Sequence, residues 1–221
     1  MPKNDCAMNQ RMRLDGSCHT CKSPYVQSQD GGMDCEFVGM RRYGKDKYYG
    51  RLRNYKQYGK GLYVWGKGRS RYYGTWLNGL KHGFGIKEFK NGSKYSGEWR
   101  DDQMEGQGEY SYKSGKVYSG SIRAGNFDGF GRFSWPDGTA IEGEFRDDDA
   151  NGKASKTWPD GSRYDGEWRD GFEDGQGTRT YSDKSAYTGG WRRGKRSGRG
   201  TLTTADGAKQ EGRWKGNKFL G

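Results

Sequence analysis

The chain repeats itself every 23 residues over roughly four-fifths of its length, and this period restricts the fold more than any other feature. From Tyr72 onward the same unit begins again near residues 95, 118, 141, 164, 187 and 210, and an earlier copy begins near 48, one residue out of step. A fixed period of this size is typical of repeat architectures, in which each unit packs only against its neighbours. We therefore predict a repeat array without a single central core.

Each unit has the pattern of a β-hairpin. Positions 1, 3 and 5 share a parity that puts them on one face of a strand, and they are usually Tyr, Gly and Trp, as in Tyr164, Gly166 and Trp168. The second strand has glycines at positions 12 and 14 and an aromatic residue at position 18 in six of seven copies. We expect a ring from one strand to cover the bare glycine sites of its neighbour, which explains why glycine recurs in a strand.

The links between units favour tight turns, because they contain pairs such as Asn91-Gly92 and Asp160-Gly161. The prediction is an all-β fold: an elongated, single-layer antiparallel β-hairpin solenoid over residues 41–221, with a half repeat from 210. Residues 1–40 are predicted to be a flexible, cysteine-containing N-terminal leader. The fifth copy departs most from the pattern, with Ile141 for Tyr and Ala154 for Gly, so weaker stacking or a bend is expected there.

This unit resembles the MORN (membrane occupation and recognition nexus) repeat, whose pattern is Tyr-x-Gly-x-Trp-x-x-Gly-x-x-x-Gly-x-Gly. The segment from Tyr164 to Gly171, followed by Gly175 and Gly177, matches it throughout. The resemblance implies a hairpin array that acts as a scaffold, as in cytoskeletal, ciliary and membrane-junction assemblies. Lipid binding is also attributed to the family, and some members form the N-terminal region of a phosphatidylinositol-phosphate kinase or a methyltransferase.

The leading functional hypothesis is a non-enzymatic scaffold that binds a protein partner along an aromatic groove. The predicted partner-binding residues belong to the repeated aromatic positions: Tyr72, Trp76, Tyr95, Trp99, Tyr112, Tyr118, Trp135, Trp158, Tyr164, Trp168, Tyr187 and Trp191. Two alternatives stay open. One is a peripheral membrane module that binds phosphoinositides, and the other is the regulatory region of a larger enzyme.

The charge is distributed in blocks. The chain carries a net charge of +12, with +12 in residues 41–90, −6 in 91–181 and +7 in 182–221. Basic blocks attract anionic membranes, acidic proteins and nucleic acid, and nucleic acid is the least favoured because the repeat already explains the tyrosines. Self-association of the alternating blocks is a further alternative. The predicted anion- or lipid-binding residues are Arg51, Arg53, Lys56, Lys60, Lys67, Arg69 and Arg71.

No cofactor is expected. All four cysteines, Cys6, Cys18, Cys21 and Cys35, precede the repeats, and their spacing is irregular for zinc. A zinc site, disulfides and reduced thiols all remain open, and the last is favoured. The carboxylates fall in turns and no apolar pocket is indicated, so we expect no catalytic site. Without a signal peptide or an apolar run of about 20 residues, we expect a cytoplasmic protein that is associated with a membrane or the cytoskeleton.

Overall fold

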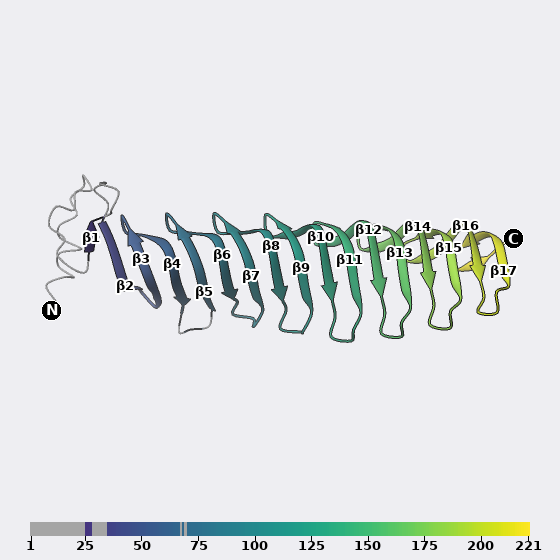
Figure 1. Ribbon diagram of the computed structural model, residues 1–221, viewed down its shortest axis with the longest axis horizontal. Helices are drawn as coiled ribbons and strands as arrows, with labels where there is room; N and C mark the ends of the chain where they lie inside the picture. The colour runs from purple at the N-terminus through teal and green to yellow at the C-terminus, as the bar shows by residue number, and fades with distance from the viewer. Residues whose placement is uncertain (1–24, 28–34, 67, 69) are drawn as a thin grey trace. The chain divides into compact units, whose positions relative to one another are not determined.

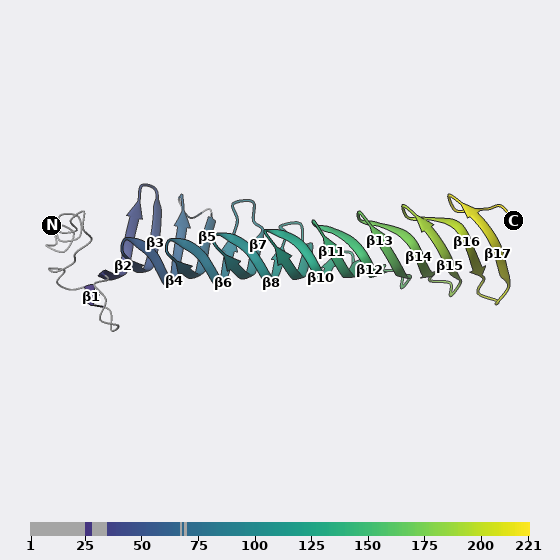
Figure 2. The ribbon, with the colours of Figure 1, turned by 90° about the horizontal axis from the view of Figure 1, so that it is seen from above.

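The computed structural model describes residues 25–27, 35–66, 68 and 70–221, and every regular element in this part of the chain is a β-strand. The chain divides into two compact units, Met1–Met104 and Glu105–Gly221. Within each unit, strands that follow one another in sequence lie side by side (Figures 1 and 2) and pair antiparallel. The predicted all-β hairpin array is therefore confirmed, and each unit is described by itself.

The strands are short and regular. The first unit contains β1 (Tyr25–Gln27), β2 (Cys35–Tyr43), β3 (Asp46–Arg53), β4 (Lys56–Trp65), β5 (Ser70–Leu77), β6 (Leu80–Glu88) and β7 (Lys94–Arg100). β8 (Gln103–Ser111) lies almost wholly in the second unit, with β9 (Val117–Arg123), β10 (Asn126–Ser134), β11 (Ala140–Arg146), β12 (Asp149–Thr157), β13 (Arg163–Arg169), β14 (Phe172–Thr180), β15 (Ala186–Arg192), β16 (Lys195–Thr203), β17 (Lys209–Lys215) and β18 (Lys218–Phe219).

The array begins before the predicted boundary at residue 41. β2 pairs with β3 along its whole length, from Glu36 opposite Arg53 to Tyr43 opposite Asp46. Gly39, opposite Gly50, takes the place that position 14 has in later repeats. β2 is thus the second strand of an additional half repeat. The sequence pattern hid it because Phe37 stands where the other copies have the glycine of position 12.

Two kinds of turn alternate along each unit. Most links between repeats contain a glycine with positive φ, such as Gly92 at +87°, as predicted, and Lys184 at +69° takes this place between β14 and β15. The turns inside each repeat are two-residue turns with positive φ at both positions, a conformation typical of type I′ turns in hairpins. Asp101 at +48° and Asp102 at +70° show that this turn forms without glycine.

A β-bulge follows the glycine of position 3 in most repeats. In β5 and β6, Gly74 pairs with Gly85 but Trp76 pairs with Lys81, so the register shifts between them. Gly83 lies in the extra segment with φ of +59°, so the glycine of position 12 is needed for its backbone conformation, and the predicted ring-covering role belongs to position 14. A bulge bends the strand, which brings the Trp of position 5 back over the Tyr of position 1.

The tyrosine of position 1 forms the core together with glycines. The Tyr118 ring lies over Gly131 so closely that a Cβ on this glycine would be 2.6 Å from Cζ of the ring. Tyr48, Tyr72, Tyr164 and Tyr187 cover the glycine of position 14 in the same way, and each of these side chains is 0% exposed. The buried hydroxyl donates a hydrogen bond to the carbonyl three residues later, 2.7 Å away for Tyr118 and Ser121. The ring-over-glycine packing predicted from the sequence is therefore confirmed.

The tryptophan of position 5 links one repeat to the preceding one. The Trp76 ring stands edge-on between Tyr48 and Tyr72, with ring centroids 5.7 and 5.0 Å away, an arrangement that the charge distribution of aromatic rings favours. Its indole Nε1 donates to the Gly61 carbonyl at 3.2 Å. Trp99, Trp168, Trp191 and Trp214 donate to the equivalent carbonyls. Burial is thus shared between neighbouring repeats.

The fifth repeat compensates for its departures from the pattern. Ile141 is 8% exposed and Ala154 is 7% exposed, so both are buried. The shorter Ile141 leaves room that the Ala154 methyl group occupies, whereas the same methyl would collide with a tyrosine. The strands β11 and β12 keep the register and bulge of other repeats, so these substitutions do not disrupt the local pairing.

This complementarity can be tested with a double-mutant cycle in the fourth repeat. Gly131→Ala should reduce the free energy of unfolding by about 2–4 kcal/mol because the new methyl group collides with Tyr118. Tyr118→Ile should cost a similar amount through a cavity. The free energy of unfolding of the double variant, measured by chemical denaturation, should fall by less than the sum of the two single losses. The difference should be at least about 1 kcal/mol. Additive losses would show that ring and glycine do not form one packing unit.

The buried tyrosines also predict loss of stability at high pH. Burial, reinforced by the Asp128 and Asp148 carboxylates, raises the pKa of Tyr118 to about 12, and burial raises the pKa of Tyr48, Tyr72 and Tyr164 as well. Each keeps its proton in the folded chain, whereas it ionises near pH 10 when unfolded. Their stabilising contribution is therefore complete below pH 10 and falls as the pH rises toward 12.

Unfolding by denaturant at increasing pH, with tyrosinate absorbance followed in parallel, measures this effect. Ionisation of all 16 tyrosines near pH 10 without loss of folded structure would contradict it.

Candidate functional site

The two faces of the hairpins differ in what they offer to a partner. We call the face with repeat positions 1, 3, 5, 14, 16 and 18 the tyrosine face, and the other face the opposite face. Nine of the twelve aromatic residues predicted to bind a partner are buried in the core of the tyrosine face, with exposed fractions of 0–6%. These nine, which cannot contact a partner in the folded chain, are Tyr72, Trp76, Tyr95, Trp99, Tyr118, Tyr164, Trp168, Tyr187 and Trp191.

The remaining three, Tyr112, Trp135 and Trp158, are half-buried and belong to a larger set. The aromatic residues of positions 16 and 18 lie side by side at the end of the second strand, where one ring edge or face stays open to solvent. We call them the ring row of each unit: Tyr63, Trp65 and Phe89 in the first, and Tyr110, Tyr112, Phe133, Trp135, Trp158 and Tyr181 in the second. Where both positions of a repeat are aromatic the two rings touch, with centroids 4.6 Å apart for Tyr110 and Tyr112 and 4.5 Å apart for Phe133 and Trp135.

The position-16 members, Tyr63, Tyr110 and Phe133, were not predicted as site residues. A signal was present for two of them, since Tyr110 precedes the predicted Tyr112 by two residues and Phe133 precedes the predicted Trp135 by two, and residues two apart in a strand share a face. Cross-strand pairing shows why these residues are only half-buried. Tyr110 pairs directly with Tyr118, so one side of its ring packs on the buried tyrosine while the other side faces solvent.

Four repeats have no ring at position 16, and in three of them a cation stands there: Lys87, Lys156 and Arg179. The Lys87 ammonium lies 3.1 Å from the centroid of Trp65. Desolvation, reinforced by repulsion from Lys81, lowers the pKa of Lys87 to about 8. The Arg179 guanidinium lies 3.9 Å from Trp158 and 5.3 Å from Tyr181, and its buried Nε has no hydrogen-bond partner among the described residues. The ring row thus combines aromatic surface with cations held against it.

The predicted anion-binding residues do not form one cluster. Arg51 and Lys60 are exposed on the opposite face of β3 and β4. Arg53 lies over the Tyr58 ring at 4.2 Å, and Arg71 is paired with Glu88 at 2.6 Å. Lys56 pairs with Arg53 across the tight turn. Lys67 and Arg69 lie outside the described residues.

Cationic side chains that were not predicted surround a hollow on the opposite face of the first unit. Arg42, Lys45 and Lys47 line a space of about 500 Å³ together with Tyr49 and Val64. None of the three forms an ion pair with another described residue. The neighbouring carboxylate, Asp46, accepts hydrogen bonds from the Tyr63 hydroxyl at 3.2 Å and the Gly66 amide at 2.8 Å.

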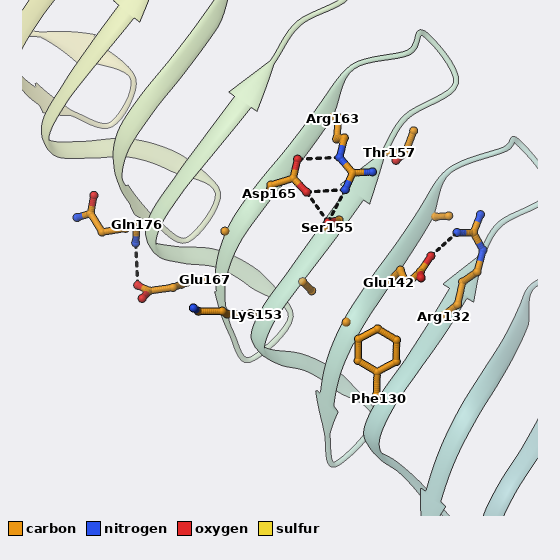
Figure 3. A pocket seen from close by; sticks show the side chains of 14 residues that line it. Phe130, Arg132, Glu142, Lys153, Ser155, Thr157, Arg163, Asp165, Glu167 and Gln176 are labelled. Atoms are coloured by element: carbon orange, nitrogen blue, oxygen red, sulfur yellow. Dashed lines mark hydrogen bonds and ion pairs between the residues drawn. The ribbon is translucent and has the colours of Figure 1, made fainter.

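In the second unit the opposite face carries ion pairs as well as the exposed Phe130. A hollow of about 690 Å³ crosses β10 to β14 (Figure 3). Arg132 pairs with Glu142 at 2.8 Å, and Arg163 pairs with Asp165, which also accepts a hydrogen bond from Ser155. The hydrogen bonds from Arg163 lower the pKa of the Asp165 carboxyl, so this group is unsuited to act as a general acid.

The metal prediction falls largely outside the described residues. Cys6, Cys18 and Cys21 lie outside them, and Cys35 starts β2 without a described side chain. Among the residues that the structure describes, no group of His, Cys, Asp and Glu side chains could hold a metal ion. The described part of the chain also contains no helix that could span a membrane.

Comparison with protein families gives six consecutive matches to one model, described as "MORN repeat". They cover residues 72–94, 95–117, 118–140, 142–163, 164–186 and 187–209. The hairpin of β3 and β4 and the strand β17 lie outside these matches but keep the same core contacts. No curated protein matches the chain.

Solved structures that resemble the chain do so distantly. The TCP domain of SAS-4 (dCPAP) of Drosophila melanogaster, in complex with a proline-rich motif of Ana2 (dSTIL), is 14% identical, with 71% of this chain and 84% of that chain covered and a TM-score of 0.45. The TCP10 domain of Danio rerio CPAP, in complex with a peptide of Danio rerio STIL, is 16% identical, with 86% and 98% covered and a TM-score of 0.41. Likenesses of this degree carry no conclusion about function.

Proposed function

Since this chain belongs to the MORN-repeat family, we propose that it is a non-enzymatic scaffold that binds a protein partner along the ring row of its tyrosine face. The observation that carries the proposal is the ring row itself. The core already uses the rings of positions 1 and 5, yet a second set of rings stays half-exposed beside it. Aromatic side chains that a partner can cover are typical anchors of protein interfaces.

The chemistry beside the rings favours a partner that brings hydrogen-bond acceptors. Arg179 presents a guanidinium held between Trp158 and Tyr181, with its Nε unpaired among the described residues. A carboxylate or a main-chain carbonyl of the partner would accept a hydrogen bond from the outer nitrogens of this guanidinium, while apolar side chains of the partner cover the rings. An extended or helical segment of a protein meets both needs.

The proposal of a non-enzymatic role has support from the opposite-face hollow of the second unit. Two of its three carboxylates, Glu142 and Asp165, are paired with arginines. The pKa of the Asp165 carboxyl is lowered, whereas acid–base catalysis uses groups poised near neutral pH. A role as the regulatory region of a larger enzyme, self-association, and a cytoplasmic location at a membrane or the cytoskeleton remain predictions.

The scaffold function is tested by affinity capture at near-physiological salt with the full chain. The triple variant Trp135→Ser, Trp158→Ser and Tyr181→Ser removes the open rings of the second unit. We expect proteins that the wild type enriches to be captured about tenfold less by this variant, because it lacks the anchoring rings.

Phe130→Ser is the control, because Phe130 is an aromatic residue, 64% exposed, on the opposite face of the same unit. Circular dichroism and a thermal melt establish that both variants fold. Equal capture by the folded triple variant would refute the ring row as the binding surface.

A peripheral membrane module is the second candidate, and the unpaired cations of the first unit favour it. Arg42, Lys45 and Lys47 surround one hollow, and Arg51 and Lys60 are exposed on the same face. Each such cation contributes about 1 kcal/mol to the attraction toward an anionic membrane surface.

Co-sedimentation with vesicles tests this candidate. Replacement of Arg42, Lys47, Arg51 and Lys60 by Gln should abolish sedimentation with vesicles that contain phosphatidylserine or a phosphoinositide, because attraction depends on charge. Vesicles of phosphatidylcholine alone are the control. Wild-type protein that stays in the supernatant with every vesicle would contradict the membrane role.

A further inference from the structure

The opposite face of the first unit carries a line of apolar side chains that crosses the strands. Met40 pairs with Tyr49, Tyr49 with Leu62, Leu62 with Tyr73, and Tyr73 with Ile86. Directly paired residues share a face, so these five form one continuous row over β2 to β6, which we call the apolar stripe.

The stripe is open to solvent. Met40 is 45% exposed, Tyr49 is 40% exposed and Tyr73 is 56% exposed, while Leu62 and Ile86 are half-buried between them. The corresponding row in the second unit is polar: Arg132, Glu142, Ser155 and Asp165 follow one another there. The polar row of the second unit shows that the fold does not require apolar residues at these positions. An exposed apolar row in the first unit is therefore typical of a surface that binds a partner.

Cations stand on both sides of the stripe. On one side Arg42 pairs with Lys47, and Lys45 lines the same hollow with Tyr49. On the other side lie Arg51 and Lys60. None of these five cations forms an ion pair with a described residue, so the flanks present unneutralised positive charge.

Large and small side chains alternate along the apolar stripe at a spacing close to that of two turns of an α-helix. Tyr49 and Tyr73 stand two strands apart, about 9.6 Å, with the shorter Leu62 between them. Residues seven apart on an α-helix are separated by about 10.5 Å. Large apolar side chains at i and i+7 of a helix would therefore fit over the shorter side chains of the stripe, beside the tyrosine rings. A helix of about three to four turns spans the five strands.

We propose that the apolar stripe binds an acidic amphipathic helix of a partner protein, a second interaction surface that is independent of the ring row. The apolar face of the helix covers Met40, Tyr49, Leu62, Tyr73 and Ile86, and acidic residues on its two flanks face the cations. The flanking cations alone would attract either such a helix or an anionic membrane. The stripe favours the helix, because a continuous row of apolar residues matches the narrow apolar face of a helix, whereas a bilayer contact gains energy from a wide apolar area. Val38 and Phe84, which are 54% and 60% exposed, add apolar surface on the two end strands β2 and β6.

The test uses the full chain and three fluorescent synthetic peptides of about four helical turns. The first has Leu at i, i+3, i+4 and i+7 spacing with Glu on both flanks. The second has Lys in place of every Glu, and the third has the composition of the first in scrambled order. Fluorescence anisotropy should show binding of the first peptide, and affinity at least about tenfold weaker for the other two.

Two sets of variants assign the site. Tyr49→Ser with Tyr73→Ser should weaken binding of the acidic peptide about tenfold or more, as should Arg42→Glu with Lys47→Glu. Phe130→Ser in the second unit is the matched control for an exposed opposite-face aromatic residue and should bind like the wild type. All changed side chains are exposed, and a thermal melt verifies folding.

Each contrary result identifies another occupant. Failure of the acidic peptide to bind, or equal binding of the scrambled peptide, would overturn the proposal. If Tyr49→Ser with Tyr73→Ser abolishes sedimentation with anionic vesicles and leaves peptide binding intact, the stripe is a membrane contact. If the same change turns a dimer into a monomer in analytical ultracentrifugation, the stripe binds a second copy of the chain. The peptide test does not depend on the affinity-capture test of the ring row, so a negative result there would not decide this proposal.

Discussion

The packing of a tyrosine ring against bare glycine backbone is the interaction on which the structure depends. A flat ring needs space that only the absence of a Cβ provides, and Tyr118 over Gly131 uses that space fully. The hydroxyl at the end of the ring is buried, so it must find an acceptor, and the Ser121 carbonyl supplies it. The tryptophan of position 5 then closes the gap to the preceding repeat, as Trp76 does edge-on to two tyrosines and hydrogen-bonded to a glycine carbonyl. Short-range contacts of this kind explain how a chain with 29% hydrophobic residues folds.

The fifth repeat shows that this interaction tolerates change only when both partners change. Ile141 and Ala154 each depart from the repeat pattern. When each position is compared with the pattern separately, both are expected to destabilise the repeat. In the structure the two changes compensate for each other, because the smaller side chain at position 1 leaves room for the methyl group at position 14. The repeat therefore keeps its register, and the expected weakness is not visible in its local pairing.

The rings of positions 1 and 5 are buried in the core, so binding must depend on the side chains that stay exposed. On the tyrosine face this is the ring row, in which Lys87 and Arg179 bring charge against the rings. On the opposite face the two units differ, with apolar and unpaired basic residues in the first and paired polar residues in the second. The repeats are alike in what folds them and unlike in what they expose, which is how one architecture can present different surfaces along its length.

The sequence by itself determined the period, the hairpins and the identity of the core, since parity within a strand and the repetition of Tyr, Gly and Trp are local properties. It could also place Tyr112, Trp135 and Trp158 beside the core. Only the tertiary structure decided that Tyr72 or Trp168 is enclosed and cannot meet a partner, because exposure depends on how the bulges bend each strand over its neighbour. The same holds for β2, whose Phe37 breaks the glycine pattern, and for the apolar stripe. Met40, Tyr49 and Leu62 belong to three different strands, so their proximity follows from cross-strand register, which no single stretch of sequence contains.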